Sequence, residues 1–167
     1  MSATTEVISH WNALIENFSA SPQAFYQAVT ESIQKREIPN ARIDKISWNE
    51  SHLLSAKREY LRISCKNDFY FAVCGAPFGT GFFVSWWLLA PPAGCLVALL
   101  NAIPGLGVLA AALARPWTYY RIDTASMFQT ATHQAVLEVV DRMTTTPGVR
   151  ALSEAERKPV MRELYGG

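Results

Sequence analysis

The feature that most constrains this fold is a long stretch without charge. No Asp, Glu, Lys or Arg occurs between Asp68 and Arg115, so residues 69–114 form a run of 46 uncharged residues in a chain that is 17% charged. The 15 basic and 14 acidic residues, 29 in all, lie in the two flanks. Because exposed segments carry charges for solvation, the stretch predicts either contact with a membrane or an unusually dry core or interface.

The composition limits the domain size, the partners and the compartment that this protein can have. A chain of 167 residues with 50% hydrophobic residues is the size of one domain with a substantial core. A net charge of +1 gives no field that would attract nucleic acid, so we expect no such partner. The cysteines Cys65, Cys74 and Cys95 form no CxxC pair, which indicates a reducing compartment. The N-terminus lacks the pattern of a signal peptide, so we expect the polar flanks to be cytoplasmic.

Helical periodicity is found at both ends of the chain. Val7, Trp11, Leu14 and Ile15 recur at helical spacing and predict a first helix. Further helices are predicted from the capping signal at Ser21 and Pro22 to Lys35, over 127–143, and after a cap at Ser153.

Alternating and β-branched patterns predict the strands of an antiparallel sheet. These segments are Ala41–Trp48, Arg58–Cys65, Phe69–Cys74, Phe82–Leu89 and Trp117–Thr124. A polar turn at residues 66–68 joins two of them into a hairpin. The predicted fold class is therefore α+β, with an antiparallel sheet of four to five strands and N- and C-terminal helices. We expect a single domain over 1–167 that carries an apolar insertion at 82–114, in a membrane or at an interface.

The apolar insertion has three open interpretations. Residues 93–114 are long enough for one transmembrane helix. A hairpin that dips into the membrane, bent at Pro91-Pro92 or at Pro104-Gly105, would return both ends to one side. In the third interpretation the segment is a buried core helix or the interface of a soluble oligomer. A strand after Arg115 would rejoin the sheet, which favours the hairpin or a buried insertion over a simple crossing.

The interface candidates follow from this segment and its borders. Residues expected in the membrane or interface are Trp86, Trp87, Leu96, Leu99, Leu100, Ile103, Leu106, Leu109 and Trp117. The tryptophans have the amphipathic rings that favour the headgroup region. Basic residues that precede the apolar run are candidates for lipid headgroup binding: Lys57, Arg58, Arg62 and Lys66.

The sequence contains no clear catalytic, metal-binding or phosphate-binding motif. The histidines His10, His52 and His133 are scattered, with no metal-ligand spacing, and we expect neither a metal nor a cofactor. Glycines at 75, 79 and 81 lack the Lys-Ser/Thr end of a phosphate loop and predict a tight turn instead. Catalytic residues stay unknown.

Three runs of the sequence carry a resemblance: REYLRISCKNDFYFAVCGAPFGTGFFVSWW, TYYRIDTASMFQ and ALSEAERKPVMREL. Together they look like a group of small uncharacterised bacterial proteins, over roughly residues 41–164. The resemblance implies no activity.

Cys95 carries a second resemblance, because it follows a helix and a series of four predicted strands. This order is similar to ubiquitin-conjugating enzymes, which implies a cysteine that forms a thioester. The His-Pro-Asn motif of that family is absent, and a strand is predicted where the family has helices. Both departures put the activity in doubt.

These patterns together predict a non-enzymatic adaptor or complex subunit. Its apolar segment would enter a bilayer or a larger assembly, with membrane lipids or a protein as partner and the polar parts in the cytoplasm. The first alternative is a soluble cytoplasmic homo-oligomer whose charge-free segment forms the subunit interface. The second is the cysteine-dependent, ubiquitin-conjugating-like enzyme.

Overall fold

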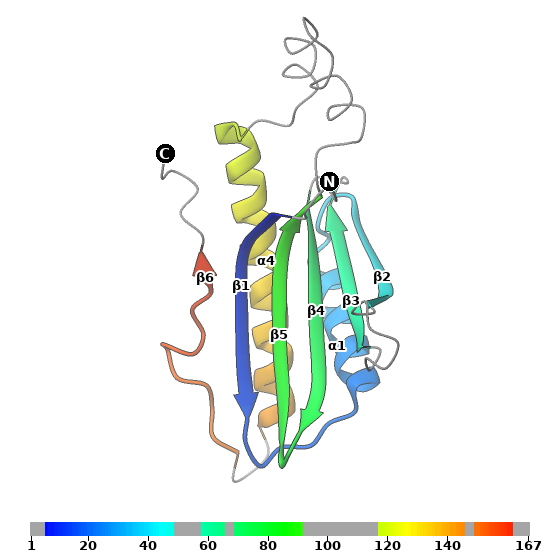
Figure 1. The fold of residues 1–167 in the computed structure, drawn as a ribbon, viewed down its shortest axis with the longest axis vertical. Helices are drawn as coiled ribbons and strands as arrows, with labels where there is room; N and C mark the ends of the chain where they lie inside the picture. The colour runs from blue at the N-terminus through cyan, green and yellow to red at the C-terminus, as the bar shows by residue number, and fades with distance from the viewer. Residues whose placement is uncertain (1–5, 49–57, 66–68, 92–116, 146–148, 162–167) are drawn as a thin grey trace, which may run out of the picture.

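The computed structural model describes residues 6–48, 58–65, 69–91, 117–145 and 149–161. Within these residues an antiparallel sheet is covered on one face by α1 (Pro22–Lys35) and α4 (Tyr119–Thr144) (Figure 1). The strands lie in the order β2-β3-β4-β5-β1-β6. Their bounds are β1 Glu6–Ile15, β2 Ala41–Trp48, β3 Arg58–Cys65, β4 Phe69–Phe78, β5 Gly81–Ala90 and β6 Val160–Met161. The predicted α+β class with an antiparallel sheet is confirmed.

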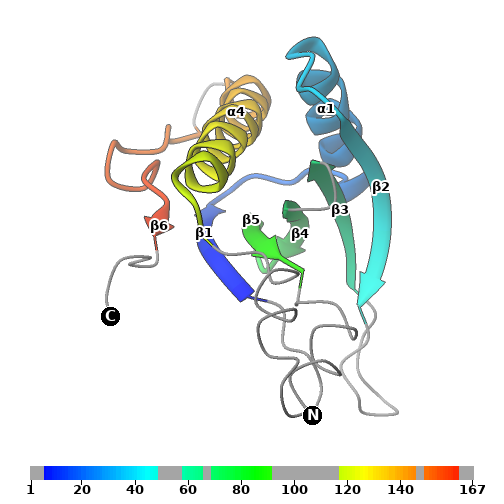
Figure 2. The ribbon, with the colours of Figure 1, turned by 90° about the horizontal axis from the view of Figure 1, so that it is seen from above.

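The sheet curves around the two helices, with β1 beside α4 and β2 beside α1 (Figure 2). We call the face that the helices cover the inner face and the opposite one the outer face. Alternate strand residues point to opposite faces, so each strand contributes to both. The helices are joined to each other by Glu138 of α4, which pairs with Arg36 at 2.7 Å and accepts a hydrogen bond from Ser32 at 3.3 Å.

The predicted first helix is wrong, because its residues form β1, which pairs with β5 over its whole length. The register shifts between Val7 and Ser9, which marks a β-bulge at Ile8. Two apolar residues of the strand, Val7 and Leu14, are exposed on the outer face, so apolar residues occur on both faces and their combined spacing resembles a helix. The inner face of β1 carries Trp11 and Ile15, both buried.

The predictions for α1 and the central strands are confirmed. Ser21 caps α1 and accepts a hydrogen bond from the amide of Ala24, with Pro22 in the first turn. Strands β2 and β3 have the predicted bounds, while β4 extends past Cys74 to Phe78. The expected turn between β4 and β5 includes Gly79, whose φ of 58° is a conformation that glycine adopts at little cost.

Two C-terminal predictions need correction. The predicted strand Trp117–Thr124 is helical from Tyr119 onwards, because Thr118 caps the helix and accepts from the amide of Arg121 at 3.2 Å. This helix runs on through the predicted segment at 127–143 as one element. Between Ser153 and Met161, the last residue that the structure describes, there is no helix. The Ser153 and Glu156 side chains cap a single turn, and the chain then pairs β6 with β1.

The inner face is rich in aromatic side chains, and three of its buried polar side chains, Ser9, Gln129 and His133, have hydrogen-bond partners, while the Thr132 hydroxyl has none within the described residues. Trp86 is fully buried and its indole N–H donates to Nδ1 of His133 at 3.1 Å. Nε2 of His133 therefore carries the proton and donates to the carbonyl of Arg157 at 2.7 Å. Ser9 donates to Gln129 at 2.6 Å, also between the sheet and α4. This network fixes α4 and the C-terminal segment against the sheet.

Tyr26 of α1 sits where β3 and β4 separate. Its hydroxyl donates to the carbonyl of Glu59 at 2.7 Å and accepts from the amide of Gly75 at 3.2 Å, so it bridges the two strands. Burial raises the pKa of the Tyr26 phenol above its usual value. A side chain at Gly75 would collide with Phe25, whose Cδ1 would lie 2.4 Å from the added Cβ. Glycine is therefore required for α1 to approach the sheet.

Candidate functional site

The charge-free stretch divides between the sheet and a part that lies outside the described residues. Phe69 to Ala90 supply β4 and β5, the two strands at the centre of the sheet. Residues 92–114, most of the predicted insertion, are not among those described. In the part of the chain that the structure describes, no helix has both the length and the apolar character needed to span a membrane.

The two borders of that undescribed part lie together at one end of the sheet. We call this end the β5–α4 end and define it by Phe69, Pro91, Trp117, Tyr119, Tyr120 and Arg121. It is the upper end in Figure 1, where β5 stops and α4 starts. Leu89, near the end of β5, pairs with Tyr70 at the start of β4.

Aromatic stacking attaches the start of α4 to the start of β4. The rings of Trp117 and Phe69 stack with centroids 5.9 Å apart and planes 24° apart. The guanidinium of Arg121 lies over both rings, 4.5 Å from the centroid of Trp117 and 5.3 Å from that of Phe69. Such cation–π contacts stabilise an arginine beside an aromatic surface. The chain that leaves the sheet at Pro91 therefore returns to it at the same end.

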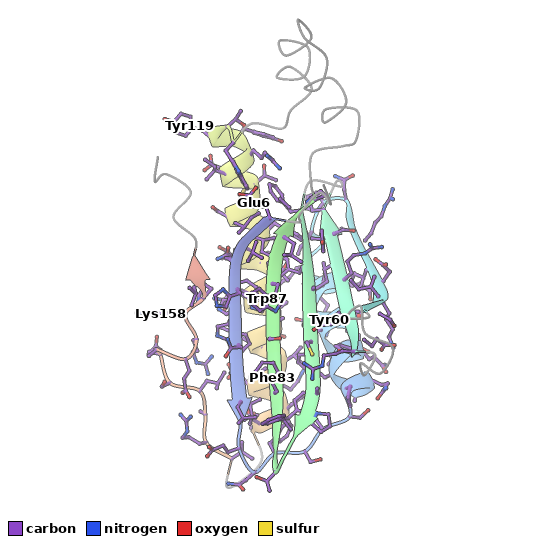
Figure 3. The ribbon with its side chains drawn as sticks, viewed as in Figure 1. Glu6, Tyr60, Phe83, Trp87, Tyr119 and Lys158 are labelled. Atoms are coloured by element: carbon purple, nitrogen blue, oxygen red, sulfur yellow. The ribbon has the colours of Figure 1, made fainter. Side chains whose placement is uncertain are left out.

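The first turn of α4 presents two tyrosines to the surroundings. Tyr119 is 83% exposed and Tyr120 is 74% exposed. The helix projects beyond the upper edge of the sheet, and Tyr119 lies at its tip (Figure 3). Large exposed aromatic residues at the tip of an element are a common sign of an interaction surface.

A groove opens on the outer face beside the β5–α4 end. Its volume is about 290 Å³ and it is lined by Arg42, Asp44, Arg62, Ser64, Phe69, Tyr70 and Pro91. We call it the β2–β4 groove. The register explains its composition, because Arg42 is paired with Ser64, and Ser64 with Tyr70, across three adjacent strands. Phe69 and Pro91 belong both to the groove and to the β5–α4 end.

An ion pair forms one wall of the β2–β4 groove. Arg62 binds Asp44 through two hydrogen bonds, Nε to Oδ1 at 3.0 Å and Nη2 to Oδ2 at 2.5 Å. The hydrogen bonds to Asp44 raise the pKa of the Arg62 guanidinium above its ordinary value. Both side chains are more than two-fifths exposed, so the pair adds little to stability. Its geometry instead fixes the position of the Arg62 guanidinium.

The outer face changes from polar to apolar between β3 and β1. Trp87 of β5 is 38% exposed and stacks on His10 of β1, with ring centroids 4.9 Å apart. Val7 and Leu14 of β1 are exposed to a similar degree. Figure 3 shows Trp87 and Phe83 along β5 on the face turned to the viewer.

The predicted interface residues fall into separate environments. Trp86 has no exposed surface and lies in the core, so its side chain is not available to a membrane or a partner. Trp87 lies on the outer face, while Trp117 is at the β5–α4 end. The other apolar candidates lie outside the described residues: Leu96, Leu99, Leu100, Ile103, Leu106 and Leu109.

The predicted headgroup residues are divided as well. Arg62 lines the β2–β4 groove, but Arg58 begins β3, at the far end of the strand from Cys65. Arg58 and Arg62 are four residues apart, about 13 Å along the strand, and Arg58 does not line the groove. Lys57 and Lys66 lie outside the described residues, as does Cys95.

Sequence patterns alone do not identify three residues of the β5–α4 end and the β2–β4 groove. Tyr119 and Tyr120 were assigned to a strand, although two tyrosines directly after a charge-free run are a usable signal. Arg42 was not singled out because its proximity to Ser64 and Tyr70 depends on the pairing of β2 with β3 and β4. A register prediction for the sheet would have found it.

Comparisons with known proteins add no function. No family model matches the chain, and no curated protein matches it. Among solved structures, it is similar to the di-domain ARO/CYC StfQ from the steffimycin biosynthetic pathway, with a TM-score of 0.32 and 12% identity. That match covers 82% of this chain and 50% of the StfQ chain, so the chain spans half the length of that structure. A likeness at this level supports no argument about activity.

Proposed function

We propose that this protein is a non-enzymatic adaptor or complex subunit that attaches to a membrane through the β5–α4 end. In this proposal the charge-free segment 92–114 enters the bilayer and returns on the same side. The α+β body stays in the cytoplasm, where its surface binds a protein partner. The uncharged character of the segment supplies the apolar surface that insertion requires.

The position of the two segment borders is the observation that supports this proposal. Pro91 follows β5, and Trp117 stacks on Phe69 at the neighbouring end of β4. A segment held at both borders to one end of a sheet enters and leaves on one side, as a hairpin does. A single crossing would instead separate α4 from the sheet, which the burial of Phe128 and Val136 of α4 in the core opposes.

The surface around this end suits a bilayer interface. Tyrosine and tryptophan favour the headgroup region, where one side of the ring is apolar and the other hydrated. Tyr119 and Tyr120 are exposed at the tip of α4, and Trp117 lies two residues before Tyr119. Arg121, over the Trp117 ring, places a cation at the same level. Arginine at this depth is attracted to anionic lipid.

Membrane fractionation of the full chain tests the proposal. The protein is expected to pellet with membranes and to stay there in about 1 M salt, where charge interactions are screened beyond about 3 Å. The double variant Leu99→Asp with Leu109→Asp is expected to move to the supernatant, because each buried charge costs about 3 kcal/mol in a bilayer. A matched control, Ala24→Asp with Gln27→Asp, changes two exposed positions of α1 and should remain in the pellet.

The same experiment contains the outcomes that contradict the proposal. Release of the wild-type chain by salt would rule out insertion. A fully soluble wild-type chain that elutes as a defined oligomer, and dissociates in the Leu99→Asp, Leu109→Asp variant, would replace the proposal with the homo-oligomer whose interface is the charge-free segment.

A further inference from the structure

The β2–β4 groove contains a cation that has no partner within the described residues. Arg62 is held by Asp44, whereas the Arg42 guanidinium makes no ion pair or hydrogen bond to any described residue. The charged groups of the lining are Arg42 (+1), Arg62 (+1) and Asp44 (−1), which sum to +1. An exposed groove with one unneutralised guanidinium attracts an anion.

Two hydroxyl groups lie beside this cation. Arg42 and Ser64 are opposite each other in the β2–β3 ladder, and the Ser64 hydroxyl donates a long hydrogen bond of 3.4 Å to the Arg42 carbonyl. Rotation about the Cβ–Oγ bond can redirect this proton to a ligand. Tyr70 is opposite Ser64 on the next strand. Directly opposite residues have Cβ atoms about 5 Å apart, so the three side chains can reach one small ligand. A guanidinium and two hydroxyls are donors that match the several acceptor oxygens of a phosphate group.

The groove's place in the fold selects the source of that phosphate. Pro91 lines the groove and is the last described residue before the charge-free segment. Phe69 also lines it and stacks on Trp117, the first described residue after that segment. A groove beside the entry point into a bilayer lies at the level of the lipid headgroups.

We propose that the β2–β4 groove binds the phosphate group of an anionic phospholipid, with Arg42 as the principal ligand, Ser64 and Tyr70 as hydrogen-bond donors, and Arg62 as a second cation held in place by Asp44. The inference rests on the proposed membrane attachment and adds the class of lipid to it. The groove's volume of about 290 Å³ accommodates a headgroup phosphate but not a whole lipid, whose chains remain in the bilayer.

Vesicle binding of the full chain and two charge-matched variants tests this site. Arg42→Gln removes the groove cation. Lys45→Gln removes one exposed cation from the same strand, but Lys45 points to the other face and pairs with Glu59 at 3.1 Å. Both variants lose one positive charge, so their general attraction to an anionic surface falls equally. The vesicles are phosphatidylcholine alone and phosphatidylcholine mixed with phosphatidylglycerol.

We expect the two variants to differ in vesicle binding only when the vesicles contain anionic lipid. Arg42→Gln should lower the partition coefficient about fivefold, the factor that corresponds to about 1 kcal/mol for one arginine at an anionic surface. Lys45→Gln should lower it less than about twofold, and neither variant should change binding to phosphatidylcholine alone. Equal losses in the two variants, or equal wild-type binding to both vesicle types, would overturn the headgroup site while leaving membrane attachment intact.

Inorganic phosphate provides the second arm, which does not depend on a membrane. Phosphate should shift the backbone amide resonances of Ser64 and Tyr70 in the wild type and should not shift them in Arg42→Gln. If phosphate binds in this way but the wild type binds no vesicle of either composition, the ligand is a soluble phosphate, and both the lipid assignment and the membrane attachment fail. If phosphate produces no shift and Arg42→Gln binds anionic vesicles like the wild type, the groove is not an anion site.

Discussion

Trp86 and Trp87 are consecutive residues of β5, yet they belong to different parts of the molecule. Trp86 points to the inner face, has no exposed surface and contacts Phe71 and His133. Trp87 points to the outer face, is 38% exposed and contacts His10. The two-residue period of a strand produces this separation. Charge depletion and aromatic content alone predict a membrane or interface position for both residues. These two signals therefore cannot distinguish a core from an interaction surface.

The polar groups of the two faces show why they differ. On the inner face the Trp86 indole N–H, the His133 ring and the carbonyl of Arg157 form a closed series of hydrogen bonds. On the outer face the Arg42 guanidinium has no such partner within the described residues, and Trp87 is 38% exposed. Satisfied polar groups stabilise a fold, whereas unsatisfied exposed ones remain available to a ligand.

The largest effect is expected where the inner face is most closely packed. Trp86→Ala should lower the free energy of unfolding by about 4 kcal/mol, because it removes a large buried ring and leaves a cavity beside Phe71. The acceptor nitrogen of His133 also loses its donor. Urea denaturation followed by circular dichroism measures the change. A loss below about 1 kcal/mol would show that this ring is not part of a packed core.

An acid-sensitive loss of stability should come from the same face. Burial lowers the pKa of His133 below its ordinary value of 6.5, and the hydrogen bond to the Arg157 carbonyl only partly opposes this. In the unfolded chain His133 therefore becomes protonated near pH 6.5, whereas in the folded chain it stays neutral to a lower pH. Stability is constant above that pH and falls as the pH decreases towards the folded-state pKa, by at most about 1.4 kcal/mol per pH unit.

Urea denaturation between about pH 5 and pH 7 measures this loss, with a control that keeps the hydrogen bonds. In His133→Gln the amide can accept from Trp86 and donate to the Arg157 carbonyl, but it does not titrate. The pKa of Glu138 is lowered from 4.5 by its hydrogen bond to Arg36, so that carboxylate contributes only below this window. A slope that persists in His133→Gln would assign the pH dependence to another group.

Local sequence signals predicted much of this sheet, and the misassigned elements have physical reasons. Strands β2 to β5 alternate or run apolar between turn residues, and Ser21-Pro22 is a strong helix start. In β1 the exposed Val7 and Leu14 add apolar residues to the outer face, so the strand has an apolar spacing typical of a helix. Tyr119 and Tyr120 have high strand propensity, yet they begin α4 because Thr118 caps it and the rest of the helix packs on the core.

The candidate site was harder to predict because it depends on pairs that are distant in sequence. The charge-free run points to one part of the chain, and the position of Arg62 before that run makes it a candidate. The groove that contains Arg62 exists only because β2, β3 and β4 bring Arg42, Ser64 and Tyr70 into line. Register is set by the whole sheet and by the turns between strands, so a reading of separate segments does not supply it.

The smallest effect is expected from the exposed member of the tryptophan pair. Trp87→Ser should lower the free energy of unfolding by about 1 kcal/mol, since it removes a cross-strand stack with His10 on a surface that water already reaches. The far-ultraviolet circular dichroism spectrum should be unchanged, because the β1–β5 ladder needs no side chain from Trp87. Urea denaturation beside Trp86→Ala measures the contrast. Equal losses from the two variants would mean that the outer face is as fully packed as the inner one, and that Trp87 lies in a core rather than on an interaction surface.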